Sequence, residues 1–196
     1  MAPPAVFIDA NALVPISLAN LLLRIAEEGL IEPFWSSQVL AEARFWAKEL
    51  NPGTPSASID RRFADMAQAF DAAIIGTDGI DPGDYPSKDP DDTMVIGAAH
   101  RSPADTIITR NLGDFPRSTL DRHGLRAITA DQLLLNLLKA NPDQIYGVVT
   151  DMQSAMKRPP LSIAAILDSL AKAGVPRFAA ALNDRLGTLA GGVPRA

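Results

Sequence analysis

Acidic and amide side chains stand at four separate places in this sequence where they could carry out metal-dependent chemistry. Asp9 follows an apolar run, Glu42 lies within a helical segment, Asp92 precedes another apolar segment, and Asn111 and Asp114 follow a later one. Oxygen ligands of this kind suit Mg²⁺ or Mn²⁺, which leave room for water and a substrate phosphate. Two such ions about 3.5 to 4 Å apart can activate a water for phosphodiester hydrolysis. Such a set of residues therefore predicts a candidate nuclease site.

Short buried strands must bring these residues together. The run 5–8 is apolar without a polar break, as expected of a strand covered on both faces of a parallel sheet, and it delivers Asp9 to its carboxyl end. Ligands of open α/β sheets bind outside that edge, so acids that follow neighbouring strands should converge there. Further strands are expected at 30–35, 106–109 and 126–129, and a short apolar piece stands at 74–75.

Helical segments alternate with these strands, which favours a three-layer α/β/α sandwich around a parallel sheet. We expect helices over 13–28, 38–50, 59–73, 93–100 and 132–140, the last starting at Asp131, with an irregular loop over 77–90 and another over 110–116. After Asn141 strand signals disappear, and three amphipathic helices are expected over 142–156, 162–173 and 176–186. The sequence thus predicts a domain over 1–140 and an all-helical appendage over 141–196.

Composition limits the possible chemistry. The 196 residues are 47% hydrophobic, which supports a real core, and the absence of cysteine excludes disulfides, thiolate metal sites and a cysteine nucleophile. The 18 basic and 23 acidic residues give a formal charge of −5, which argues against broad adhesion to nucleic acid, although bound metal would reverse the sign locally. No apolar run could span a membrane, and the start lacks a signal peptide, so we expect a cytoplasmic protein.

Each candidate residue also has a purely structural interpretation. Asp9 could cap a helix that starts near Ala12, Asp91 could favour a helix amino terminus, and Asp114 could hold a turn. Glu42 could be a solvated helix residue. The two histidines, His100 and His123, are expected on the surface or in loops rather than as ligands, and the two tryptophans, Trp35 and Trp46, in the core or an interface.

Four stretches together resemble the PIN domain, and in particular the VapC-like toxins of toxin–antitoxin systems. The first is the strand with Asp9-Ala10-Asn11, and the second is Ser37 with Glu42 five residues on. The others are Asp89-Pro90-Asp91-Asp92 before an apolar helix, and the most specific stretch, Ala104-Asp105-Thr106-Ile107-Ile108-Thr109-Arg110-Asn111-Leu112-Gly113-Asp114-Phe115-Pro116. The resemblance covers about residues 5 to 130, and the helical tail resembles the extension of some longer members.

That resemblance implies a Mg²⁺- or Mn²⁺-dependent ribonuclease. Its acidic cluster would be Asp9, Glu42, Asp92 and one of Asn111 or Asp114. Many members have an acid where this chain has Asn111, whose carbonyl oxygen can bind metal but adds no charge. Asp91 instead of Asp92 could be the third ligand, because one residue of helix register decides which side chain faces Asp9; we favour Asp92. Four further residues are expected to support the site by orienting these acids: Asn11, Ser37, Thr109 and Asp91.

The resemblance also implies an RNA substrate and a cognate antitoxin, with a helix laid in an apolar groove as the mode of binding. A homodimer is possible, and no membrane partner is expected. Two alternatives stay open. A phosphatase of the haloacid dehalogenase type would form an aspartyl phosphate on Asp9, but it needs a second acid at Asn11 and a later lysine. The other is a PIN-like binding module with a decayed site.

Overall fold

The structure is a computed structural model that describes residues 2–155 and 160–191, with side chains described up to residue 186. Five parallel strands form one sheet in the order β3-β2-β1-β4-β5. Their bounds are Ala5–Ile8 for β1, Glu32–Ser36 for β2, Ile74–Ile75 for β3, Thr106–Ile108 for β4 and Arg126–Ile128 for β5. The four strands predicted from the sequence are therefore present, with β1 at the centre, and the short apolar piece at 74–75 forms the edge strand β3.

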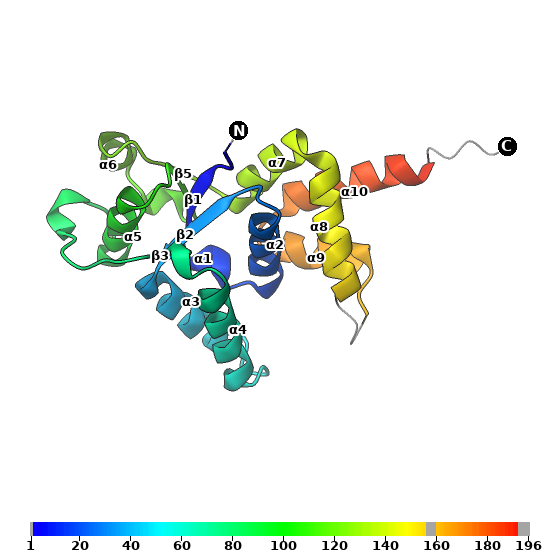
Figure 1. The fold of residues 1–196 in the computed structure, drawn as a ribbon, viewed down its shortest axis with the longest axis horizontal. Coiled ribbons are helices and arrows are strands. Elements are labelled where there is room, and N and C mark those ends of the chain that lie inside the picture. Colours follow the sequence, from blue (N-terminus) through cyan, green and yellow to red (C-terminus); the bar gives the residue numbers. More distant parts are fainter. Residues whose placement is uncertain (1, 156–159, 192–196) are drawn as a thin grey trace.

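Helices surround the sheet in the predicted three-layer arrangement. In Figure 1 the sheet lies between α5 and α6 on one side and α2 with the carboxyl-terminal helices on the other. The first half of the chain contains α1 (Ala10–Leu13), α2 (Ile16–Glu27), α3 (Ser37–Leu50) and α4 (Ser56–Ala69). Next come α5 (Pro90–Arg101), α6 (Arg117–Arg122) and three 3-10 turns, η1 (Asp71–Ala73), η2 (Pro82–Asp84) and η3 (Leu112–Asp114).

The two central strands are buried on both faces. Phe7, Ile8, Ile107 and Ile108 have no measurable exposure, as the unbroken apolar runs in the sequence predicted. Their register pairs Phe7 with Ile107 and Ile8 with Ile108, so β1 and β4 end side by side. Residues that follow these two strands therefore start from the same edge of the sheet.

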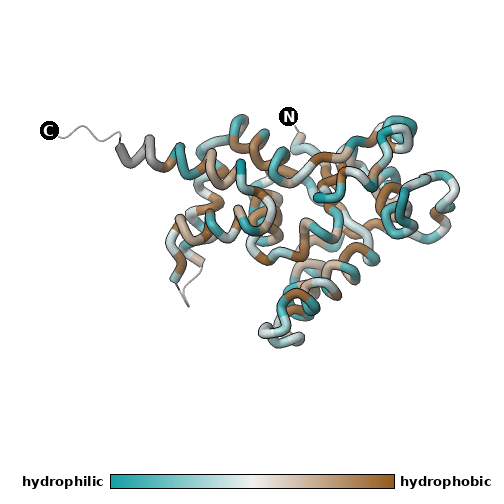
Figure 2. The backbone as a smooth tube through the Cα atoms, turned by 180° about the vertical axis from the view of Figure 1, so that it is seen from behind, coloured by the Kyte–Doolittle hydropathy of each residue, from teal (hydrophilic) through white to brown (hydrophobic). Residues whose placement is uncertain are grey.

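The carboxyl-terminal part is helical, as predicted. It consists of α7 (Ala130–Ala140), α8 (Pro142–Ala155), α9 (Ile163–Lys172) and α10 (Pro176–Gly191). These helices pack on one another and on α2, and Figure 2 shows hydrophobic and hydrophilic residues alternating along them, as in amphipathic helices. Buried Phe178 and Leu170 contribute to their core. No helix in the described part of the chain has the length and apolar character needed to cross a bilayer.

Three local predictions were wrong. The segment predicted as one helix over 13–28 is two helices, because Pro15 is not helical and α2 begins only after it. A short helix, α6, occupies 117–122, where no helix was predicted. Asp131 does not start α7: Thr129 is the cap, and its Oγ1 atom accepts a hydrogen bond from the Gln132 amide at 3.2 Å.

Asp131 instead joins α7 to α10. Its side chain is 7% exposed, and its Oδ1 atom accepts a hydrogen bond from the Phe178 amide at 2.8 Å. The Nε atom of Arg177 lies 4.0 Å from the other carboxylate oxygen. A buried carboxylate is thus satisfied by the first turn of a helix far along the chain, which fixes the start of α10 on α7.

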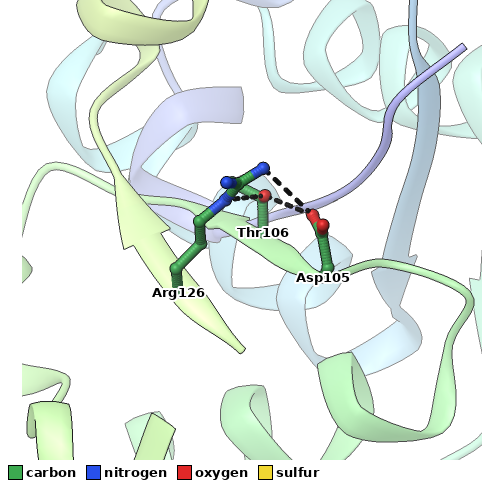
Figure 3. A network of polar contacts seen from close by, with 3 residues as sticks. All are labelled: Asp105, Thr106 and Arg126. Atoms are coloured by element: carbon green, nitrogen blue, oxygen red, sulfur yellow. Dashed lines mark hydrogen bonds and ion pairs between the residues drawn. The ribbon is translucent and has the colours of Figure 1, made fainter. Parts of the chain in front are cut away.

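The amino edge of the sheet carries a different polar network. The Arg126 Nε atom donates to Thr106 Oγ1 at 2.8 Å, and the Thr106 hydroxyl donates to Asp105 Oδ1 at 2.5 Å (Figure 3). Arg126 also lies 3.5 Å from the Asp105 carboxylate, on the exposed surface. A cavity of about 600 Å³ opens at this edge and has no acidic residue in its lining. This network joins β4 to β5 at the end of the sheet opposite the predicted acidic cluster.

Candidate functional site

A cleft of about 370 Å³ lies at the carboxyl ends of β1 and β4. It gathers side chains from α1, α3, α5 and the segment after β4, four regions that are far apart in the sequence. This is the sheet edge at which ligands bind in open α/β folds. The polar residues of its lining are Asp9, Asn11, Glu42, Asp89, Asp91, Asp92, Arg110, Asn111 and Asp114.

Asp9 is the most buried acid of the cleft, with 5% of its surface exposed. It does cap a helix, because its Oδ1 atom accepts a hydrogen bond from the Ala10 amide at 2.7 Å. Its Oδ2 atom accepts hydrogen bonds from Thr109 Oγ1 at 2.7 Å and Asn11 Nδ2 at 2.5 Å. Burial raises the pKa of Asp9, and these hydrogen bonds oppose that rise by stabilising the carboxylate. The cap role and the cleft role therefore coexist in one side chain.

Asn11 and Thr109 form a supporting layer behind Asp9. The Asn11 amide also donates to Thr109 Oγ1 at 3.0 Å, and its carbonyl oxygen accepts from the Arg110 backbone N–H at 2.9 Å. The Asn111 backbone N–H donates to the same threonine oxygen at 3.1 Å. These contacts fasten the segment after β4 to the start of α1, so the position of Asp9 depends on both elements.

Asp92 lies in the first turn of α5, whose cap is Asp89. The pKa of Asp92 is raised to about 7, first by partial burial and then by the negative charges of Asp9, Asp114, Asp89 and Glu42, in that order. Asp91, the alternative third ligand, also lines the cleft but is exposed. Asp92 is thus more buried than Asp91 and is affected by the charge of Asp9, and its choice as the third ligand stays a prediction.

Glu42 reaches the cleft from the first half of α3. Its pKa is raised by partial burial and then by the charges of Asp9, Asp91 and Asp89. The pKa shift shows that the charges of these acids act on Glu42, which lines the same cleft. Its side chain is nevertheless exposed, so Glu42 is a solvent-accessible acid of the cleft lining.

Asp114 and Asn111 come from the segment after β4, at the two ends of η3. Both line the cleft, and the Asp114 carboxylate is close enough to raise the pKa of Asp92. The Asp114 backbone carbonyl accepts a hydrogen bond from Ser87 Oγ at 2.5 Å, which anchors η3 to the loop before α5. Asn111 is more exposed. The charge nearest to Asp92 in this segment is therefore that of Asp114.

Ser37 does not contact the acids. It is exposed and makes no hydrogen bond with another described residue, whereas Ser36 Oγ accepts from the Val39 amide at 3.1 Å and caps α3. Ser36 also borders a small pocket next to Glu42 and Asp91. Ser36 therefore caps α3, and among the described residues Ser37 has no contact through which it could orient the acids.

Histidines take no part in the cleft. The ring centroids of His100 and His123 lie 4.7 Å apart, with the rings tilted by 53°, beside Tyr85, whose hydroxyl lies 3.0 Å from His100 Nδ1. This cluster belongs to the far end of α5 and the end of α6. The sequence interpretation, which made neither histidine a ligand, agrees with this position.

Two cleft residues were not predicted from the sequence. Trp35 is buried, as expected, but Trp46 is 46% exposed and lines the acidic cleft, where we had expected a core or interface position. Arg110 also lines the cleft. Its place directly after Thr109 could have indicated this, because every residue after that strand starts at the same sheet edge. The cleft thus contains an aromatic and a cationic side chain beside its acids.

The donor set fits a hydrated divalent cation. Six carboxylates share the cleft, and burial together with their mutual repulsion raises the pKa of Asp92 to about 7. Among residues 2–155 and 160–191, however, no three acidic or histidine side chains are arranged closely enough to bind one ion directly. Mg²⁺ commonly binds through one or two carboxylates and keeps several waters, so the wider spacing matches that mode of binding.

Comparisons with known proteins agree with this architecture. Residues 5–113 match the model of the PIN domain, and residues 130–184 match the model of the VapC50 C-terminal domain. The chain is 35% identical over 89 residues to a Mycobacterium tuberculosis (strain ATCC 25618 / H37Rv) protein named "Putative ribonuclease VapC50". That match covers 45% of this chain and 52% of the relative, so it spans about half the relative's length. No solved structure is significantly similar to the chain.

Proposed function

This chain belongs to the PIN domain family, and from that premise we propose that it is a divalent-metal-dependent endoribonuclease, the toxin of a toxin–antitoxin pair. The observation that carries the proposal is the gathering of Asp9, Glu42, Asp92 and Asp114 at one sheet edge, where burial and mutual repulsion raise the pKa of Asp92 to about 7. Carboxylates crowded to this extent gain from a bound cation. The relative's name supports RNA as the substrate.

Mg²⁺ or Mn²⁺, when bound, would supply an activated water and neutralise charge on the scissile phosphate. Asp9 and Asp92 would hold the first ion, with Glu42 binding one of its waters. Asp114 and the side-chain carbonyl oxygen of Asn111 would bind a second ion. Asn11 and Thr109 keep the Asp9 carboxylate oriented through the hydrogen bonds to its Oδ2 atom.

An antitoxin partner rests on the family resemblance, and a groove between α2 and α4 offers it a site. The groove has a volume of about 260 Å³, and its apolar lining includes Leu23, Met66 and Ile16, which is 66% exposed. Arg24, Arg62 and Glu27 border it. An amphipathic helix from a partner fits this combination of apolar floor and charged rim. A cytoplasmic location and a homodimer belong to the same proposal.

Cleavage of structured RNA tests the proposal. The purified chain should cleave RNA with Mg²⁺ or Mn²⁺, and EDTA should stop the reaction. Asp9→Asn should lower the rate by about 100-fold or more, because it removes the central carboxylate while keeping its shape. Unchanged activity in Asp9→Asn would refute the mechanism.

Two further measurements address the alternatives. A binding module with a decayed site would bind no Mn²⁺ in calorimetry, whereas an active site should bind it and lose that binding in Asp92→Ala. A phosphoryl adduct trapped on Asp9 would favour the phosphatase instead. That chemistry needs a second acid at Asn11, but here the Asn11 amide donates to Asp9 itself.

A further inference from the structure

We propose that Arg110 binds a phosphate of the RNA substrate, and that Gly174, in the carboxyl-terminal helices, holds the Arg110 guanidinium in position beside the cleft. The inference rests on the proposed ribonuclease function and extends it to a substrate-contact residue and a role for the helical appendage. It starts from the charges of the cleft and from a close contact between two distant parts of the chain.

The cleft is poorly suited to a polyanion without a cationic side chain. Six acids line it, and among the described lining residues Arg110 is the one with positive charge. A nucleic-acid backbone that approaches this surface meets repulsion in addition to the chain's formal charge of −5. A metal ion offsets part of that repulsion, and a fixed guanidinium would offset more of it at a defined place.

The Arg110 guanidinium is available for such a contact. Its backbone N–H donates to Asn11 Oδ1 at 2.9 Å, which fixes the residue at the carboxyl end of β4. Its side chain is exposed and forms no ion pair or hydrogen bond with the residues that the structure describes, in spite of the nearby carboxylates. Arginine presents five N–H donors in a planar fork that matches the oxygens of a phosphate. An unpaired fork beside a metal-type cleft therefore suits phosphate binding.

Gly174 keeps the fork in place. It lies between α9 and α10 with φ at +102°, and a Cβ atom added there would be 3.3 Å from Nε and 3.4 Å from Cζ of Arg110. The guanidinium thus packs against bare backbone, and a Cβ atom there would make it shift by a few tenths of an ångström. The start of α10 is itself held on α7 by the hydrogen bond between Asp131 and the Phe178 amide. Through this chain of contacts the appendage sets the position of a cleft residue.

Measurements of RNA affinity distinguish phosphate binding by Arg110 from a purely structural contact between Arg110 and Gly174. The probe is a fluorescein-labelled RNA oligonucleotide of mixed sequence, bound in Mg²⁺ to protein carrying Asp9→Asn so that it is not cleaved. Adding Arg110→Ala should weaken binding about tenfold and make the slope of log K against log salt shallower by about 0.7, the value for one lost phosphate contact on a single strand. Arg110→Lys should restore the slope but only part of the affinity. Unchanged affinity and slope in Arg110→Ala would overturn the proposal.

A double-mutant cycle tests the part played by Gly174. Gly174→Ala alone should reproduce part of the effect of Arg110→Ala on RNA affinity, and it should add nothing when Arg110 is already alanine. Gly124→Ala is the matched control: Gly124 also has a positive φ, +67°, but open space around its Cβ position. That control carries the same kind of backbone strain and should leave RNA affinity unchanged. Additive losses in the cycle would overturn positioning by Gly174.

Failure of this inference can be told from failure of the proposed function. If the parent chain cleaves RNA with metal but Arg110→Ala keeps its affinity and salt slope, the inference is wrong and the ribonuclease stands. If the parent chain neither cleaves nor binds RNA, both are wrong. Melting temperatures measured for each variant check that the changes in binding do not come from unfolding.

Discussion

The hydroxyl of Thr109 donates a hydrogen bond to the Oδ2 atom of Asp9 at 2.7 Å, although the two residues are 100 positions apart in the chain. Thr109 is fully buried, and its oxygen also accepts hydrogen bonds from the Asn11 side chain and the Asn111 backbone. One hydroxyl thus ties together the ends of β1 and β4. The orientation of the most buried acid of the cleft depends on it.

Thr109→Val should therefore impair catalysis. Valine has nearly the shape of threonine but no hydroxyl, so the Asp9 carboxylate loses a donor and two N–H groups lose their acceptor. We expect kcat/KM for RNA cleavage to fall by about 10- to 100-fold, the usual cost of losing a group that orients a metal ligand. Thr109→Ser keeps the hydroxyl and should stay near the parent activity. Full activity in Thr109→Val would show that Asp9 needs no support from β4.

The raised pKa of Asp92 predicts how stability depends on pH when divalent metal is absent. The folded-state pKa is about 7 against an ordinary value of 3.8, so between these pH values the folded chain keeps a proton that the unfolded chain releases. Stability should therefore fall as pH rises from about 4 to about 7 and then level off. Thermal melts in EDTA at pH 5 and pH 8 should give the lower melting temperature at pH 8.

Asp92→Asn should weaken this pH dependence while abolishing activity. The amide cannot ionise, so at pH 8 it removes repulsion with Asp9 and Asp114. Because Asp92 is only partly buried and water screens the repulsion, we expect a gain of about 1 kcal/mol, or roughly 2 to 4 °C in melting temperature. The melting temperature of the variant should still fall with rising pH, but less steeply, since the pKa values of Asp9 and Glu42 are also raised. An identical pH dependence in the variant would contradict the assignment to Asp92.

The fourth metal ligand can be identified by comparing Asp114 with Asn111. The Asp114 charge acts on Asp92, whereas Asn111 is neutral and more exposed. Asp114→Asn should weaken Mn²⁺ binding about tenfold in calorimetry, and Asn111→Ala should weaken it less. Asp121→Asn is the control for a change in net charge, because Asp121 is an exposed acid on α6 that pairs with Arg117. If Asn111→Ala weakens Mn²⁺ binding more than Asp114→Asn does, Asn111 is the fourth metal ligand.

Local patterns in the sequence predicted the part of the fold that positions the acids. Val6, Phe7 and Ile8 are apolar in succession because both faces of their strand are covered, and the same holds for Ile107 and Ile108. Since parallel strands end at one edge, the order of strands and acids along the chain was enough to assign those acids to one site. The family match over residues 5–113 confirms the resemblance noted from the same motifs.

Contacts between distant residues could not be predicted in this way. Asp131 looked like the start of a helix, but its partner is the Phe178 amide 47 residues later. Arg110 and Gly174 likewise meet only because α9 and α10 fold back toward the sheet. The division of the chain at residues 140 and 141 stays a prediction, and the second family model begins at residue 130, the start of α7.

The hydrogen bond from Phe178 to Asp131 should stabilise the docking of α10. Asp131→Ala leaves the Phe178 amide without its acceptor and takes a negative charge from the start of that helix, which should cost about 1 to 2 kcal/mol in the free energy of unfolding. Asp131→Asn keeps an acceptor oxygen and should cost less. Urea unfolding of the three proteins at pH 7 measures these differences.

Arg177 lies 4.0 Å from the carboxylate and is largely exposed, so Arg177→Ala should change stability by less than about 0.5 kcal/mol. Equal losses for Asp131→Ala and Arg177→Ala would mean that the ion pair, and not the hydrogen bond to the helix, holds α10 in place.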